Sequence, residues 1–132
     1  MKYMLIFGVL VISQQCLVKC RCFGADVDDE SKWPGHVRNV TAKCIKNYLN
    51  QTEVIVKWKE PIQKSNVAVT GYQIAYYLEG GFGQFLCGHT KQGIHQFVIR
   101  RGLLPAKRVE IGVIARPSFP GLLTLLVTVK IC

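Results

Sequence analysis

Alternation of apolar and polar side chains with a period of two is the feature that most limits how this chain can fold. Val54, Val56 and Trp58 would share one face of an extended chain, while charged residues occupy the other face. Two more segments, residues 71–77 and 108–115, repeat the pattern. An amphipathic helix would need apolar residues at a period of about 3.6. These three segments are therefore expected to be strands that bury one side.

Weaker alternation marks four further strands, at residues 37–42, 84–88, 95–99 and 122–129. Gly and Pro residues separate the segments at intervals of about ten residues, as turns in a β-sandwich do. The expected fold is all-β, a seven-stranded antiparallel β-sandwich. The side chains expected to fill its core are those of Trp58, Tyr72, Ile74, Tyr76, Val109, Ile111 and Val113.

The first 24 residues have the composition of an export signal. Lys2 precedes an apolar run at residues 3–12, and small or polar residues follow through Gly24. The run is shorter than the about 20 apolar residues that a membrane helix needs, although an uncleaved anchor is the alternative. Cleavage is expected between residues 20 and 24, which leaves no transmembrane anchor. A flexible acidic lead-in, residues 25–33, would then precede one domain, residues 34–132.

Two N-x-T sequons support export. Asn39 and Asn50 are both acceptors for N-glycosylation if the chain enters the secretory pathway. Chance occurrence is the alternative, because the motif is short. We expect a secreted, extracellular glycoprotein.

The charge is strongly positive. Beyond residue 24, 14 Lys and Arg stand against 8 Asp and Glu, a formal charge of +6. Such an excess favours anionic partners by steering and by counterion release. Outside the cell these are sulfated glycosaminoglycans or acidic proteins, and nucleic acid is not expected. A positive surface that only aids solubility is the alternative.

Several residues in order resemble a fibronectin type III domain, an immunoglobulin-like β-sandwich. Trp58 is followed by Pro61, then by the Gly71-Tyr72-x-Ile74-x-Tyr76 strand, then by Leu103-x-Pro105 and the strand that begins near Val109. The resemblance covers residues 34–131. It implies that Trp58 packs in the core, and that the corner tyrosine of such domains is replaced here by Val109.

The resemblance also implies how the cysteines are arranged. It places the end of the first strand and the end of the last strand at one end of the sandwich, so Cys44 and Cys132 are expected to form a disulfide. Cys87 would lie near the opposite end, where Cys22 could pair with it. Cleavage after Cys20 retains Cys22 and cleavage after Gly24 removes it, so a single thiol at Cys87 stays open.

Two surfaces are expected to bind partners. The resemblance gathers basic side chains at one end of the sandwich, and Arg100, Arg101, Lys107 and Arg108 are the expected contacts for an anionic glycan. The other end is expected to offer aromatic anchors for a protein partner. These are Phe119, Phe82, Tyr77 and Phe85, of which some would instead belong to the core.

Catalytic patterns find little support in the sequence. The three histidines lack a hydrolase elbow or a zinc-protease motif, and Cys87 and His89 have no third group that would orient them. No pair of C-x-x-C motifs gives zinc spacing. We expect a protein that is not an enzyme, needs no cofactor or metal, and works by binding an extracellular protein as a soluble ligand, decoy or modulator. A glycosaminoglycan-binding matrix protein is the alternative.

Overall fold

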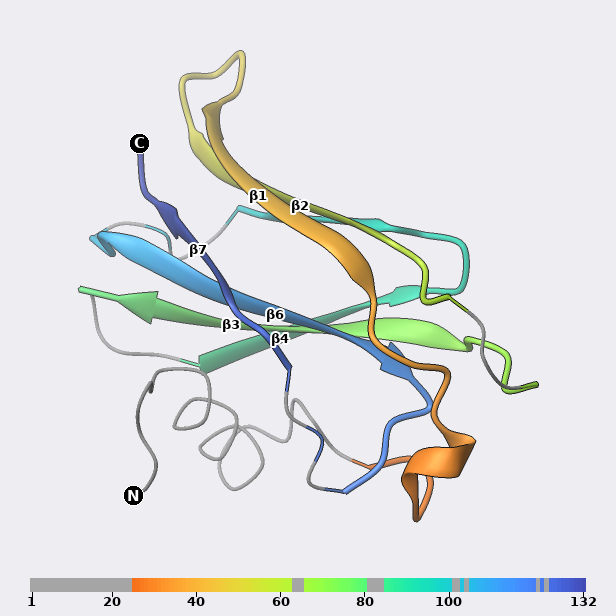
Figure 1. The fold of residues 1–132 in the computed structure, drawn as a ribbon. Helices are drawn as coiled ribbons and strands as arrows, with labels where there is room; N and C mark the ends of the chain where they lie inside the picture. Colours follow the sequence, from red (N-terminus) through yellow and green to blue (C-terminus); the bar gives the residue numbers. More distant parts are fainter. Residues whose placement is uncertain are drawn as a thin grey trace.

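The computed structural model describes residues 25–132 except 63–65, 81–84, 101–102, 104, 121 and 123. Its seven strands form two antiparallel sheets packed face to face (Figure 1), which confirms the expected β-sandwich. The expected signal, residues 1–24, lies outside the described residues. No helix within the described part of the chain has the length and hydropathy to span a membrane.

The smaller sheet contains three strands in the order β1-β2-β5. The larger sheet contains four strands in the order β4-β3-β6-β7. A short 3-10 helix, η2, precedes them at Glu30–Lys32. The strands are β1 (Arg38–Lys46), β2 (Thr52–Lys59), β3 (Gly71–Glu79), β4 (Phe85–Lys91), β5 (Gln96–Ile99), β6 (Arg108–Arg116) and β7 (Val127–Lys130).

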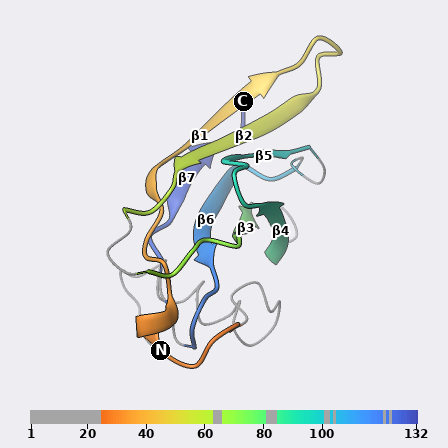
Figure 2. The same ribbon diagram turned by 90° about the vertical axis from the view of Figure 1, so that its right-hand side faces the viewer.

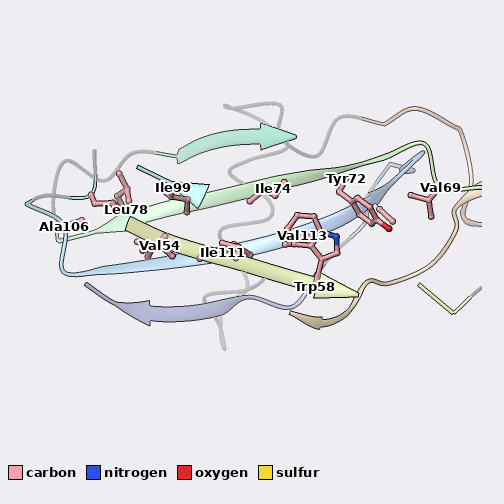
Figure 3. Close-up of a cluster of buried hydrophobic side chains, with 14 residues drawn as sticks. Val54, Trp58, Val69, Tyr72, Ile74, Leu78, Ile99, Ala106, Ile111 and Val113 are labelled. Carbon is pink, nitrogen blue, oxygen red and sulfur yellow. The ribbon is translucent and has the colours of Figure 1, made fainter. Parts of the chain in front are cut away.

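Alternate residues of the central strands fill the space between the sheets (Figure 3). On β2, Val54 and Val56 are fully buried and Trp58 is 4% exposed, while Lys57 and Lys59 between and after them face solvent. Six of the seven expected core residues are buried, and the seventh, Tyr76, is half-buried against the same cluster. Trp58 and Tyr72 meet edge to face with ring centroids 5.3 Å apart.

The pairing of β3 with β6 sets the two ends of the sandwich. Gly71 lies opposite Arg116, and Glu79 lies opposite Arg108, so the end of β3 lies beside the start of β6. The end of β3 and the start of β4 therefore lie at the same end as the start of β6. The β1–β2 turn extends beyond this end (Figure 2), and the segment ahead of β1 lies at the other end.

Candidate functional site

The first end carries the predicted disulfide, and we call it the bridged end. Cys44 on β1 is bonded to Cys132 after β7, with Cα atoms 5.8 Å apart and a sequence separation of 88. This confirms the expected bridge. It joins the edge of the smaller sheet to the edge of the larger sheet.

Basic residues of the bridged end take part in ion pairs. The Nε of Arg100 lies 3.1 Å from Oε2 of Glu53, and Nη2 of Arg108 lies 2.6 Å from Oε2 of Glu79. Lys107 is exposed between them in sequence, and Arg101 lies outside the described residues. Two of the four predicted glycan contacts thus face a carboxylate, which lowers the positive potential that an anionic chain would meet.

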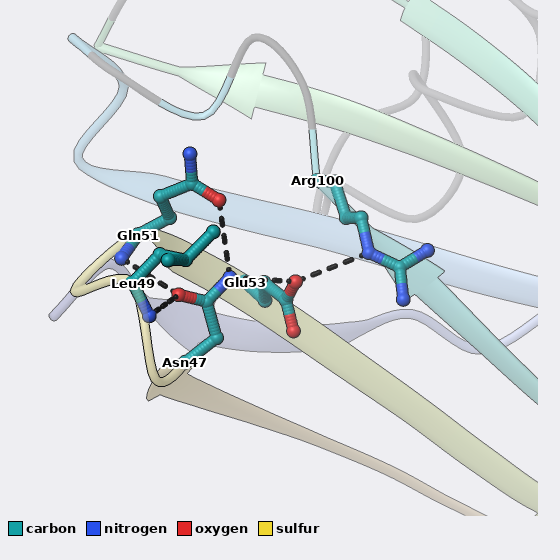
Figure 4. A network of polar contacts seen from close by, with 5 residues as sticks. All are labelled: Asn47, Leu49, Gln51, Glu53 and Arg100. Atoms are coloured by element: carbon teal, nitrogen blue, oxygen red, sulfur yellow. Dashed lines mark hydrogen bonds and ion pairs between the residues drawn. The ribbon is translucent and has the colours of Figure 1, made fainter.

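The β1–β2 turn at this end is held by the side chain of Asn47 (Figure 4). Its Oδ1 accepts hydrogen bonds from the backbone N–H groups of Leu49, at 2.8 Å, and of Gln51, at 3.0 Å. Its Nδ2 donates to Oε1 of Gln51 and to Oε2 of Glu53, and Glu53 also receives the Arg100 guanidinium. The turn is therefore fixed by side-chain bonds as well as by its strands.

Two large apolar side chains stand on this fixed turn. Tyr48 is 95% exposed and Leu49 is 60% exposed. Neither residue was predicted to be exposed, because an apolar pair next to a strand is typical of the buried face of that strand. The neighbouring Asn47 and Asn50, both turn formers, were the available signal.

The predicted aromatic surface is divided between the two ends, which is a correction. Tyr77 is half-buried near the end of β3, and that strand ends at the bridged end. Phe119 follows β6 and lies at the other end. The interpretation failed because it placed the β3–β4 turn with the β6–β7 loop, whereas the antiparallel pairing of β3 and β6 separates them. Phe82 lies outside the described residues, and so does the side chain of Phe85.

Phe119 is also less free than expected, because it packs on Trp33. The two rings meet edge to face with centroids 5.3 Å apart. Trp33 is only 8% exposed, and its Nε1 donates to the backbone carbonyl of Ala115 at 3.1 Å. The His36 ring also meets the Trp33 indole edge to face, with centroids 4.6 Å apart. We call this end of the molecule the tryptophan end.

The segment expected to be a flexible lead-in is instead attached to the tryptophan end. The carboxylate of Asp26 forms an ion pair with the guanidinium of Arg116 and accepts the backbone N–H of Ser118 at 3.0 Å. The backbone N–H groups of Asp26 and Val27 both donate to the Ser118 carbonyl. The hydrogen bond from Arg116 is the main cause that holds the pKa of Asp26 below its usual value. The sequence predicted a flexible segment because the partners of Asp26 lie about 90 residues away, whereas Asp28 pairs locally with Lys32.

His36 belongs to the lining of two hollows at the tryptophan end, and together we call them the His36 groove. One, of about 410 Å³, is bounded by Trp33, Pro34 and the exposed Ile62. The other, of about 470 Å³, lies beside the segment that leads into β7 and is bounded by Val40 and Leu125. Ile62 is 58% exposed and Leu125 is 80% exposed. The groove is mostly apolar, with His36, Arg38 and Glu30 as its ionisable side chains.

Cys87 and His89 lie side by side on the outer face of β4. Both side chains are exposed. Cys87 pairs in register with Ala75 at the middle of β3, which corrects its expected place near one end. Cys87 is disulfide-bonded, and its predicted partner Cys22 lies outside the described residues. No cluster of three potential metal ligands occurs among the residues that the structure describes.

Both sequon asparagines are exposed, and both have a left-handed backbone. Asn39 has φ 51° at an irregularity in the pairing of β1 with β2, and Asn50 has φ 60° in the β1–β2 turn. Asn39 also borders the His36 groove. The two acceptors thus lie at different ends of the molecule.

Comparisons with known proteins define the class of protein but not a family. A solved structure of a computationally redesigned β-sandwich protein is similar to this chain, with a TM-score of 0.54 and 15% sequence identity. The similar region covers 73% of this chain and 88% of the redesigned one. At that identity the likeness shows the fold alone, so the chain is a β-sandwich protein. No protein-family model and no curated protein matches the sequence.

Proposed function

We propose that this chain is an exported fibronectin type III-like glycoprotein that binds another extracellular protein through the His36 groove. The strand arrangement supports the fibronectin type III resemblance. In constant-type immunoglobulin domains the fourth strand joins the sheet of the first, second and fifth strands. Here β4 pairs with β3 in the other sheet, and Trp58 lies in the core, as the resemblance implies.

Export is supported by the chemistry of the described cysteines and asparagines. Disulfides persist in oxidising compartments and are rare in the cytosol, and Cys44 and Cys132 are joined. The two sequon asparagines are accessible. Together with the signal-like first 24 residues, these features favour a secreted protein.

The observation that carries the binding proposal is the pair of exposed apolar side chains that flank the groove. Ile62 lines the first hollow together with the buried Trp33, and Leu125 lines the second hollow. Trp33 is held by Ala115 and by Phe119. Because Trp33 is already held in place, little conformational entropy would be lost when a partner binds beside it. An apolar side chain of a partner protein could therefore bind in this hollow.

The test compares charged substitutions inside and outside the groove. The secreted protein is screened against a panel of purified extracellular receptor ectodomains, and the dissociation constant is measured by biolayer interferometry. Ile62→Asp and Leu125→Asp should each weaken binding at least about tenfold, since each places a charge in a desolvated contact. Ile94→Asp is the matched control, because Ile94 is 52% exposed but does not line the groove. Equal effects of all three changes, or no effect of any, would contradict the groove assignment.

The alternative function, binding of a sulfated glycosaminoglycan, is favoured by one observation. Arg108 and Lys130 are paired neighbours on β6 and β7 at the bridged end, and Lys46 and Lys107 belong to the same end. Heparin chromatography separates the two functions. Elution near physiological salt supports protein binding. Retention to high salt that is lost when Arg100, Arg101, Lys107 and Arg108 are all changed to Ala supports the alternative.

A further inference from the structure

The β1–β2 turn joins an unusually exposed aromatic ring to a glycan acceptor. Tyr48 is 95% exposed, and Asn50, two residues later, begins the second sequon. A tyrosine ring in water exposes a large apolar surface, so a group that packed on the ring would stabilise the protein. None of the described residues covers the ring of Tyr48.

The backbone of the turn fixes these two positions relative to one another. The N–H of Asn50 donates to the carbonyl of Asn47 at 2.9 Å, and the N–H of Asn47 donates to the carbonyl of Gln51 at 2.9 Å. The side chain of Asn47 adds its bonds to Leu49 and Gln51. Positions 48 and 50 are therefore held on one tight turn, without the freedom of a loose loop.

We infer that Asn50 carries an N-glycan whose first N-acetylglucosamine packs on the ring of Tyr48. The inference rests on the export proposed above. The C–H face of the sugar is apolar and weakly positive, and it complements the apolar, electron-rich face of the phenol. Because the turn is already ordered, little conformational entropy remains to be lost when the sugar and the ring meet.

The other sequon supplies an internal control. The residue two positions before Asn39 is Val37, which is aliphatic and packs against the core. A glycan on Asn39 therefore lacks an exposed ring at the equivalent position. Both sites have an exposed asparagine with a left-handed backbone. They differ in the residue two positions earlier, which is an exposed tyrosine at one site and a valine at the other.

The experiment uses the full chain secreted from cultured animal cells and treated with an endoglycosidase that leaves one N-acetylglucosamine on each site. Glycopeptide mass spectrometry reports which asparagine is modified. Thermal unfolding is then compared between protein with the sugar on Asn50 and protein whose Asn50 is unmodified, in the wild-type background and in Tyr48→Ser. The sugar should raise Tm by about 3 °C in the wild-type background and by less than about 1 °C with Ser at position 48.

Two further variants keep the result interpretable. Leu49→Ser changes the other exposed apolar side chain of the same turn and should leave the increment from the sugar intact. The change in Tm caused by Asn39→Gln should be the same with Tyr and with Ser at position 48. Tyr48→Ser without the sugar should unfold like the unglycosylated wild type, because an almost fully exposed ring contributes little packing.

In NMR spectra of the Asn39→Gln protein, the protons of the remaining sugar should move upfield through the ring current of Tyr48. An unmodified Asn50 beside a modified Asn39 would overturn the inference while leaving export standing. An increment that survives Tyr48→Ser would overturn it as well. A chain that stays inside the cell with both asparagines unmodified would overturn the inference together with the proposed export.

Discussion

The two ends of this sandwich are stabilised in different ways. At the bridged end, a disulfide, two ion pairs and the bonds of Asn47 tie together neighbouring strands and turns. At the tryptophan end, a segment from before the first strand is packed onto the last loop through Trp33 and Phe119. The first end is organised by polar and covalent links, and the second mainly by aromatic packing.

This difference bears on where a partner would bind. Two cationic side chains at the bridged end, Arg100 and Arg108, have carboxylate partners, which neutralise part of the positive charge there. Apolar side chains are exposed at both ends, Tyr48 and Leu49 on the β1–β2 turn and Ile62 and Leu125 at the tryptophan end, and the last two also line hollows. Unpaired apolar surface is the stronger indication of a binding site.

The largest expected effect comes from removing the disulfide of the bridged end. Changing both Cys44 and Cys132 to Ser should lower the free energy of unfolding by about 4 kcal/mol, because the bridge closes a long loop in the unfolded chain. Urea unfolding under non-reducing conditions measures this. Binding at the His36 groove should be unchanged in the folded fraction. A loss below about 1 kcal/mol would show that this end does not depend on the bridge.

Removing the indole should be the largest single change at the tryptophan end. Trp33→Ala should cost about 3 kcal/mol, since it leaves a cavity beneath Phe119 and an unpaired carbonyl at Ala115. Trp33→Phe is the matched variant, because it keeps most of the packing and loses only the Nε1 donor, and it should cost about 1 kcal/mol. Unfolding in urea distinguishes the two. Similar small losses for both variants would mean that the segment is not part of the folded unit.

The ion pair between Asp26 and Arg116 should make the tryptophan end sensitive to acid. The folded-state pKa of Asp26 is lowered, so its stabilisation is fully present above the unfolded pKa of about 3.9 and is lost as the pH falls through the folded pKa. Asp26→Asn should cost about 1 kcal/mol at pH 7 and nothing once Asp26 is protonated. Unfolding of both proteins between pH 2 and pH 7 tests this, and a difference that does not depend on pH would contradict it.

The smallest expected effect belongs to the exposed ion pair of the bridged end. Arg108→Ala should change the free energy of unfolding by less than about 0.5 kcal/mol, because both Arg108 and Glu79 are substantially exposed and water screens their attraction. Thermal unfolding at low and at high salt measures it. A loss above about 1 kcal/mol that disappears in high salt would show that the charges at this end act as a network.

The sandwich could be predicted from the sequence because the pattern that identifies each strand lies within a few consecutive residues. Val54, Val56 and Trp58 alternate within five residues, and such alternation fixes which face a strand buries. The strand boundaries moved by a few residues, and only the last strand was much shorter than expected, since residues 122 and 124–126 precede β7 without pairing as a strand.

The organisation of the ends could not be predicted in the same way. Trp33 and Asp26 find their partners at Ala115 and Arg116, more than 80 residues away, and nothing in the acidic segment itself indicates those contacts. Trp33 was the available signal, because so large an apolar side chain is seldom left in water. The groove depends on how the N-terminal segment and the last loop meet, and that is a property of the folded chain alone.

The bridge between Cys44 and Cys132 also governs how the molecule would respond to mechanical tension. A force applied between residue 25 and residue 132 would pass directly from β1 to the last residue through the sulfur–sulfur bond. Every strand from β2 to β7 lies within the covalent loop and would be shielded from that load. Only the stretch ahead of Cys44 could lengthen, so pulling would separate Trp33 from its partners and strip most of β1 from β2, while β2 to β7 stayed paired.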